Sequence, residues 1–246
     1  MNQMRRMFPS LVTAFCLSAP TASAQTYEAC LELLTEDPAR AEMEAAEWVR
    51  AGGGAAAGHC RALALLALGA DQRAAEQLVE IATGDRTLPD SVRAELLIDA
   101  GRIYMGIGAL EAAQDAVRRS LRLATDPRAA LTLSAQVKAE LQDWAGAAGD
   151  LDGALAHGEP DPELLALRAS ARRRLGQLDL AREDLRRAEA LAPESATVWL
   201  ERGALEEAGG NKDAARAAWL RAVELDRDGP VGAAARLRMQ KLEAGG

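Results

Sequence analysis

The chain has 246 residues, of which 49% are hydrophobic but only 3% aromatic, and its formal net charge is −8 at pH 7. Alanine and leucine outnumber β-branched residues, so the composition favours helices and argues against a β-sheet. A negative chain of this kind also lacks the basic surface that a nucleic-acid-binding protein needs. We therefore expect an all-α protein, built as one elongated domain or two small ones.

Residues 1–24 have the features of a cleavable signal peptide. Arg5 and Arg6 form a short basic region, and the apolar run that follows is too short to span a bilayer in the mature protein. The small residues at 22–24 then precede a cleavage site before Gln25. Removal of this segment predicts a periplasmic protein with a net charge of about −10 and no stable membrane insertion.

Three alternatives concern the same segment. The arginine pair resembles a twin-arginine export signal, but Met4 stands where that signal has serine or threonine, so general secretion is favoured. Cys16 could accept a lipid, but Phe15 occupies the preceding place, where a small residue is expected. A buried N-terminal helix is disfavoured because prolines bracket the apolar run.

Cys30 and Cys60 are the thiols that remain after cleavage. An even number of cysteines in an oxidising compartment favours a disulfide between them, and two buried free thiols are the alternative. The adjacent pair His59-Cys60 does not predict a metal site. Side chains of successive helical residues point about 100° apart, so they do not converge on one ion.

Two irregular helix pairs are expected before the regular part of the chain. In the segment 25–54, helices are predicted over 27–35 and 39–50, and the segment ends at a glycine run. The segment 55–93 follows a more regular pattern of small and bulky residues. A five-residue insertion around 87–89 interrupts the spacing at its end.

Four contiguous units of 34 residues follow, over 94–127, 128–161, 162–195 and 196–229. In each unit a bulky residue precedes a small one by four places, as Trp199 precedes Gly203. Most units turn on a glycine, but Gln142 takes this place in the unit 128–161. Each predicted helix pair is too small to hide its own apolar face, so we expect the units to stack.

Two further features belong to the C-terminal end. Trp219 lies on a helix whose apolar face is otherwise mostly alanine, and we expect its indole to fill the core between close-packed helices. The segment 230–246 predicts a single capping helix and a tail. Its basic residues, such as Arg236, Arg238 and Lys241, would keep the exposed face of this helix in water.

The 34-residue step and this residue pattern resemble the tetratricopeptide repeat. In the unit 94–127, successive positions of the family pattern are filled by Leu97, Gly101, Tyr104, Gly108 and Ala113. The resemblance is strong over 94–229 and weaker upstream. It implies a right-handed α-solenoid of stacked antiparallel helix pairs.

The sequence departs from the family pattern at the position of the first aromatic residue in the repeat. Lys138 and Arg172 stand there in the two middle units, and Glu206 stands there in the last one. We expect the lysine and arginine stems to lie over the helix pair, with their charged ends in water.

The resemblance also implies a concave groove, lined by the first helix of each pair, that binds a segment of another protein. The side chains expected in it are Ile98, Arg102, Met105, Thr132, Gln136, Ser170, Arg173, Arg174, Leu200 and Glu207. The three arginines would attract a carboxylate-bearing segment, and ordinary solvated helix arginines are the alternative. The lysine and asparagine combination with which some family members clamp a C-terminal carboxylate is missing.

No residue pattern predicts catalysis or a cofactor. The sequence has no serine, histidine and acid set, no phosphate-binding glycine loop and no metal cluster. We therefore expect a non-enzymatic, exported scaffold or adaptor that binds protein partners. A periplasmic chaperone or envelope assembly factor with several clients is the alternative, and an enzyme is a remote one.

Overall fold

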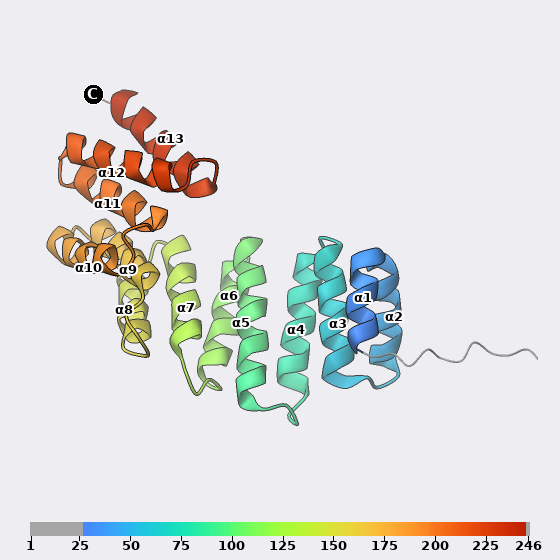
Figure 1. The fold of residues 1–246 in the computed structure, drawn as a ribbon. Coiled ribbons are helices and arrows are strands. Elements are labelled where there is room, and N and C mark those ends of the chain that lie inside the picture. The colour runs from blue at the N-terminus through green and yellow to red at the C-terminus, as the bar shows by residue number, and fades with distance from the viewer. Residues whose placement is uncertain (1–26, 245–246) are drawn as a thin grey trace, which may run out of the picture.

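A computed structural model describes residues 27–244, which form thirteen α-helices and no strand within this range (Figure 1). The all-α expectation is confirmed. The predicted signal peptide, its cleavage site and Cys16 lie outside the described residues. The helices are α1 (Tyr27–Glu36), α2 (Pro38–Arg50), α3 (Gly54–Ala67), α4 (Asp71–Gly84), α5 (Asp90–Gly106), α6 (Leu110–Leu121), α7 (Arg128–Glu140), α8 (Trp144–Leu155), α9 (Pro162–Arg174), α10 (Leu178–Leu191), α11 (Ala196–Ala208), α12 (Lys212–Leu225) and α13 (Pro230–Ala244).

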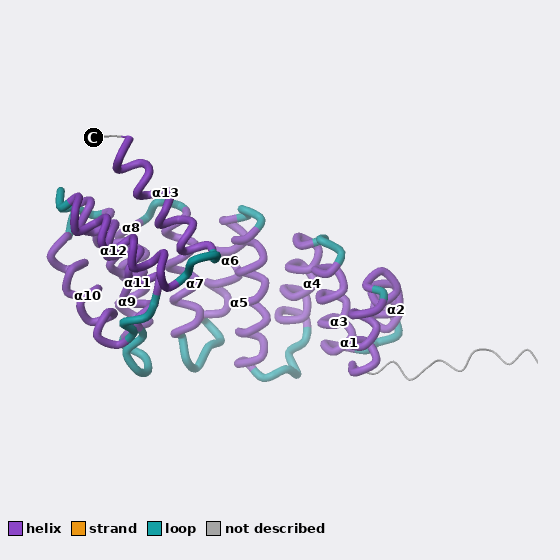
Figure 2. The backbone as a smooth tube through the Cα atoms, turned by 45° about the horizontal axis from the view of Figure 1, so that its top comes forward, coloured by secondary structure: helices purple, strands orange, loops and turns teal. Residues whose placement is uncertain are grey.

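The helices pack as successive pairs that stack in one direction. Each odd-numbered helix from α1 to α11 packs against the even-numbered helix that follows it, and α13 covers the last pair by contacting α11 and α12. Contacts between first helices, such as α5 with α7 and α9 with α11, join one pair to the next. The row of upright helices from α1 to α7 turns at α8, and the remaining pairs continue at an angle to it (Figures 1 and 2). The protein is thus an α-solenoid.

The tight turn between the two helices of a pair requires a left-handed backbone. Gly108, Gly176 and Gly210 have φ values of 75°, 75° and 81°, which glycine adopts without steric cost. Gln142 has a φ of 62° and is the one non-glycine residue with a positive φ in the part of the chain described. The prediction that this unit turns on Gln142 is confirmed, and the side chain costs about 1 to 2 kcal/mol there.

The core is built largely from alanine, which lets helices approach closely. Trp219 is the largest buried side chain, at 0% exposure, and its indole Nε1 donates to the carbonyl oxygen of Leu200 at 3.1 Å. A Cβ built at Gly203 would overlap this indole, so the small residue of the unit makes room for the large one. The predicted core role of Trp219 is confirmed.

The expectation that Lys138 and Arg172 hold their charged ends in water is wrong. Lys138 Nζ lies 2.6 Å from an Asp150 oxygen, and both side chains are mostly buried. Arg172 reaches Asp184 on α10 and Asp152 on α8, at 2.7 and 3.1 Å. Carboxylates on the neighbouring second helices therefore pair with the charges that replace the aromatic residue.

Arg168 completes this ion network, which joins α8, α9 and α10. Its guanidinium contacts both oxygens of Asp184, at 2.6 and 2.9 Å, and an Asp152 oxygen at 2.7 Å. Asp184 is only 1% exposed and Arg168 only 9%. Burial would lower the pKa of Arg168, but hydrogen bonds and charge from the two aspartates raise it, so the guanidinium remains charged.

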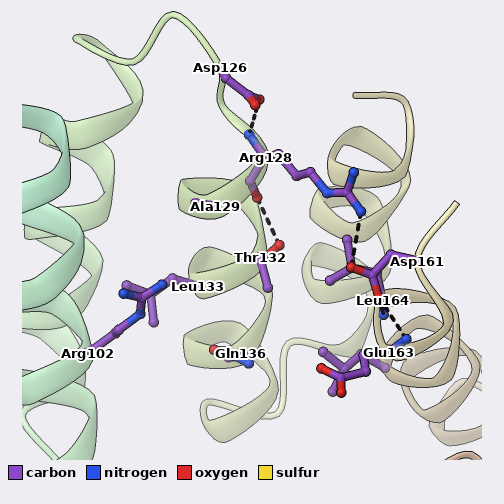
Figure 3. A pocket seen from close by; sticks show the side chains of 11 residues that line it. Arg102, Asp126, Arg128, Ala129, Thr132, Leu133, Gln136, Asp161, Glu163 and Leu164 are labelled. Atoms are coloured by element: carbon purple, nitrogen blue, oxygen red, sulfur yellow. Dashed lines mark hydrogen bonds and ion pairs between the residues drawn. The ribbon is translucent and has the colours of Figure 1, made fainter. Parts of the chain in front are cut away.

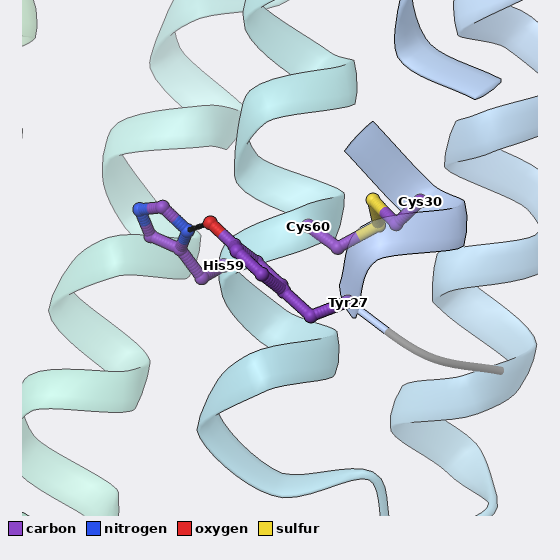
Figure 4. The surroundings of a disulfide bond; sticks show 4 residues. All are labelled: Tyr27, Cys30, His59 and Cys60. Atoms are coloured by element: carbon purple, nitrogen blue, oxygen red, sulfur yellow. Dashed lines mark hydrogen bonds between the residues drawn. A yellow bond between two sulfur atoms is a disulfide. The ribbon is translucent and has the colours of Figure 1, made fainter. Parts of the chain in front are cut away.

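A disulfide joins Cys30 on α1 to Cys60 on α3, with the two Cα atoms 6.2 Å apart (Figure 4). The pairing predicted from the cysteine count is present, whereas the free-thiol alternative is not. Trp48 packs against the same cluster. Beside it, Tyr27 Oη and His59 Nδ1 lie 2.6 Å apart, and burial lowers the pKa of His59 although Asp99 opposes this effect.

The five-residue insertion forms the connection between α4 and α5. An Asp85 carboxylate oxygen accepts hydrogen bonds from the backbone N–H and the hydroxyl of Thr87, at 2.9 and 2.6 Å. Leu88 packs against the core cluster around Leu97. The insertion is therefore anchored at both of these points, and α5 begins directly after it at Asp90.

Candidate functional site

A hollow of about 390 Å³ opens between α5, α7 and α9 (Figure 3). All of its lining residues come from these first helices or from the loops that precede α7 and α9. Arg102 projects from α5, Thr132 and Gln136 from α7, and Glu163 and Leu167 from α9. This face, which the first helices form, is called the groove below.

The charges at the mouth of the hollow are already partly paired. Arg128 bridges α7 to the next unit, since it donates to the His157 carbonyl oxygen at 3.0 Å and to Asp161 at 3.1 Å. Asp161 also caps α9 by accepting from the backbone N–H groups of Glu163 and Leu164. Among the described residues, Glu163 has no ion-pair partner, so the uncompensated charge in this hollow is negative.

A second hollow, of about 360 Å³, lies on the same face between α1, α3 and α5. Its walls are mostly apolar, with Leu88, Val92 and Leu96 among them, and its polar groups include Glu95 and Asp99. Asp99 pairs with Arg102 at 3.0 Å. Because Asp99 lines this hollow and Arg102 lines the larger one, the ion pair on α5 stands between the two.

A small apolar socket of about 70 Å³ adjoins the larger hollow and shares Gln136 and Leu167 with it. Its walls include Ala135 and Ala171, and it remains open because alanine fills so little of the space between α7, α8 and α9. The Trp144 ring forms another wall of the socket. The Arg174 guanidinium carbon lies 5.2 Å from the centre of that ring, so Trp144 is a wall of the groove rather than a fully buried core residue.

The predicted groove residues fall into separate groups. Arg102, Thr132 and Gln136 line the larger hollow together, and Ser170 lines the socket. Ile98 does not belong to the groove, because it is only 7% exposed and packs in a core cluster with Val117. The remaining apolar members are half-buried against core clusters: Met105 and Leu200.

Arg173, Arg174 and Glu207 lie beyond the larger hollow, toward the C-terminal end. The Arg173 side chain is only 11% exposed, and its Nη2 lies 3.5 Å from Glu201 on α11. Burial is the main cause that lowers the pKa of Arg173; Glu201 opposes this effect, and nearby Arg174 and Arg238 add to it. Glu207 lies 3.9 Å from Arg238 on α13. The structure therefore does not bring Arg102 and Arg173 into one basic patch.

Several groove residues were not predicted from the sequence. Arg128, Asp161 and Glu163 stand at or before the starts of α7 and α9, outside the positions that the repeat pattern projects inward. The sequence does contain a signal for Asp161, because an aspartate directly before a proline is typical of a helix N-cap. Its ion pair with Arg128 follows only from the packing of one unit against the next.

Within residues 27–244, no helix is long and apolar enough to cross a membrane. The same part of the chain holds no group of three histidine, cysteine, aspartate or glutamate side chains that could bind a metal ion.

A solenoid of helix pairs with an open groove defines the class of repeat proteins that present an extended binding face. The family model described as "Tetratricopeptide repeat" matches residues 162–195, the same residues as one of the units expected from the sequence. This match shows a tetratricopeptide repeat at residues 162–195, and the other helix pairs stack in the same way.

Several solved structures have a similar fold. MamA (41-end) from Desulfovibrio magneticus RS-1 has a TM-score of 0.58 at 20% identity, over 68% of this chain and 91% of that one. YrrB, described as a TPR protein with an unusual peptide-binding site, has a TM-score of 0.57 at 18% identity, over 86% of this chain and 99% of that one. The Cut9-Hcn1 hetero-tetramer of APC/C matches over 88% of this chain and 42% of that one, with a TM-score of 0.60 at 14% identity. No curated protein matches the chain in sequence.

Proposed function

We propose that the protein is an exported, non-enzymatic scaffold that holds a segment of a partner protein in the groove between α5, α7 and α9. The observation that carries this proposal is the 390 Å³ hollow, whose lining comes from consecutive first helices and which continues into an apolar socket. A fold with such a face suits an extended segment that contacts several units at once. The peptide-binding site named for YrrB supports the same class of function.

The chemistry of the groove fits a segment with mixed character. The Gln136 side chain, at the entrance of both the hollow and the socket, can hydrogen-bond the backbone of a bound segment. The socket suits one small aliphatic side chain. Glu163 favours a basic residue beside it, because no described cation neutralises this carboxylate.

Export rests on the predicted signal peptide and on the disulfide. A bond between Cys30 and Cys60 persists in an oxidising compartment such as the periplasm and is rare in the cytosol of mesophiles. Mass spectrometry of the protein from cells tests this part of the proposal. A mature N-terminus at Gln25 is expected. An uncleaved N-terminus would contradict export, and a lipid on Cys16 would contradict cleavage at Gln25 to an unanchored protein.

The groove is tested by blocking it. Gln136→Trp would place an indole over the hollow and the socket, and we expect a partner captured from envelope extract to bind at least about tenfold more weakly. Gln114→Trp on α6 is the matched control, because it adds the same side chain at an exposed position of a second helix. Equal capture by both variants would exclude the groove as the binding site.

The same capture separates a scaffold from the alternative of a chaperone with several clients. One stoichiometric partner supports the scaffold. A spread of unfolded proteins, lost in Gln136→Trp and kept in Gln114→Trp, would support the chaperone instead.

A further inference from the structure

A third hollow, of about 430 Å³, lies on the other side of the solenoid, where the second helices α4 and α6 flank the start of α5. Four arginines line it, namely Arg86, Arg93, Arg119 and Arg122, against the single carboxylate of Asp115. Leu123 is half-buried and contributes apolar surface, whereas Leu97 is only 1% exposed and belongs to the core. The chain has a net charge of −8, so this hollow is a local excess of positive charge on an otherwise negative protein.

Two of these arginines are already neutralised. Arg93 pairs with Asp90 at 2.8 Å and also donates to the carbonyl oxygen of Ala82 at the end of α4. Arg119 pairs with Asp115 at 2.6 Å. The bond to Ala82 joins α5 to the end of α4, and both ion pairs lie within one helix, so these two arginines have a structural role.

The other two arginines have no such role. Arg86 and Arg122 are exposed, and neither makes an ion pair with any residue that the structure describes. Arg86 is carried by the five-residue insertion, whose backbone is fixed by the bonds between Asp85 and Thr87. The insertion therefore brings an additional, uncompensated positive charge to a hollow that already contains another at Arg122, directly after α6.

We propose that this hollow binds an acidic segment of a second protein partner. Guanidinium groups pair with carboxylates through two parallel hydrogen bonds, so Arg86 and Arg122 can each engage one acidic side chain. The half-buried side chain of Leu123 suits the aliphatic part of the same segment. Elsewhere the acidic surface of the protein repels such a segment, and this charge difference favours one docking position.

The site does not depend on the groove. The groove is lined by first helices and the arginine hollow mainly by the second helices α4 and α6, so a partner in one leaves the other open. If both sites are occupied, the protein holds two different partners together, one with a basic and apolar segment and one with an acidic segment.

The test uses the full mature protein and a short fluorescein-labelled peptide of alternating glutamate and leucine. Fluorescence anisotropy should show binding that weakens as salt is raised, because exposed charge pairs are screened. The double variant Arg86→Glu/Arg122→Glu should bind the peptide at least about tenfold more weakly. The charge-matched control Arg182→Glu/Arg187→Glu, on the exposed surface of α10, should bind like the parent protein.

Circular dichroism of both variants verifies that they are folded. Equal loss of binding in the two double variants would show a general charge effect and overturn the proposal, as would a parent protein that does not bind the peptide. Binding to vesicles that contain phosphatidylglycerol, without binding to the peptide, would also overturn it and assign the hollow to a lipid surface. Gln136→Trp should leave peptide binding unchanged, so failure of this site and failure of the groove give different results.

Discussion

The buried ion network between α8, α9 and α10 gives a sharp test of what holds the solenoid together. Asp184→Ala removes the buried one of the two carboxylates that both Arg168 and Arg172 contact, and its oxygens accept three hydrogen bonds of 2.6 to 2.9 Å. After the change, Arg168 would remain only 9% exposed, with Asp152 as its sole carboxylate partner among the described residues. We expect the free energy of unfolding to fall by about 3 to 5 kcal/mol, because a buried charge loses its partner.

Asp152→Ala is the matched control, since it removes the same chemical group from the same two arginines. The Asp152 side chain is 55% exposed, so water can replace it, and we expect a loss below about 1 kcal/mol. Asp184→Leu separates charge from volume, because it fills the space without restoring the charge. If the unpaired arginines cause the loss of stability, Asp184→Leu should lower the free energy of unfolding by about as much as Asp184→Ala.

Urea unfolding followed by far-UV circular dichroism measures these differences, with the slope compared between variants because repeat arrays can unfold in steps. A loss in Asp184→Ala no larger than that in Asp152→Ala would refute the reasoning. Recovery of stability in Asp184→Leu would show that the cost arises from a cavity instead.

Three further predictions concern stability, and thermal melting measures each of them. Gln142→Gly should stabilise the protein by about 0.5 to 1 kcal/mol, since it removes the left-handed strain at a cost in chain entropy; a lower melting temperature would contradict this. Reduction of the bond between Cys30 and Cys60 should cost about 3 to 4 kcal/mol by the loop-entropy estimate for their separation of 30 residues, and an unchanged melt would exclude that contribution. Gly203→Leu should cost about 3 kcal/mol or more, because the new side chain would overlap Trp219, whereas the exposed change Gly149→Leu should cost less than about 1 kcal/mol.

The helix pairs could be predicted because the determinants of each unit are local. The alternation of bulky and small residues, the turn residue and the 34-residue step all lie within one pair, so even Gln142 could be assigned to its turn. The disulfide followed from the cysteine count, together with the expectation that residues 1–24 are a signal peptide. Neither inference needed the arrangement of one unit relative to the next.

The groove was harder to predict because it depends on that arrangement. Sequence position alone placed Ile98 and Arg173 in the groove with Arg102, but Ile98 is core and Arg173 is held against Glu201 on the next first helix. The charges of Lys138 and Arg172 were likewise expected in water. Their partners Asp150 and Asp184 lie on second helices, and the repeat pattern contains no signal that such a pair forms.

The four tryptophans are spread along the solenoid, so their fluorescence can report which part of it unfolds first. Trp48 lies beside the disulfide at the N-terminal end, Trp144 borders the socket in the middle, and Trp219 is sealed in the last pair beside α13. Only Trp219 is fully shielded from water, so its emission should be the bluest and should shift most when the last pair melts. Variants that retain one tryptophan would therefore show whether unfolding starts at the C-terminal end, starts at the N-terminal end that carries the disulfide, or involves all helix pairs together.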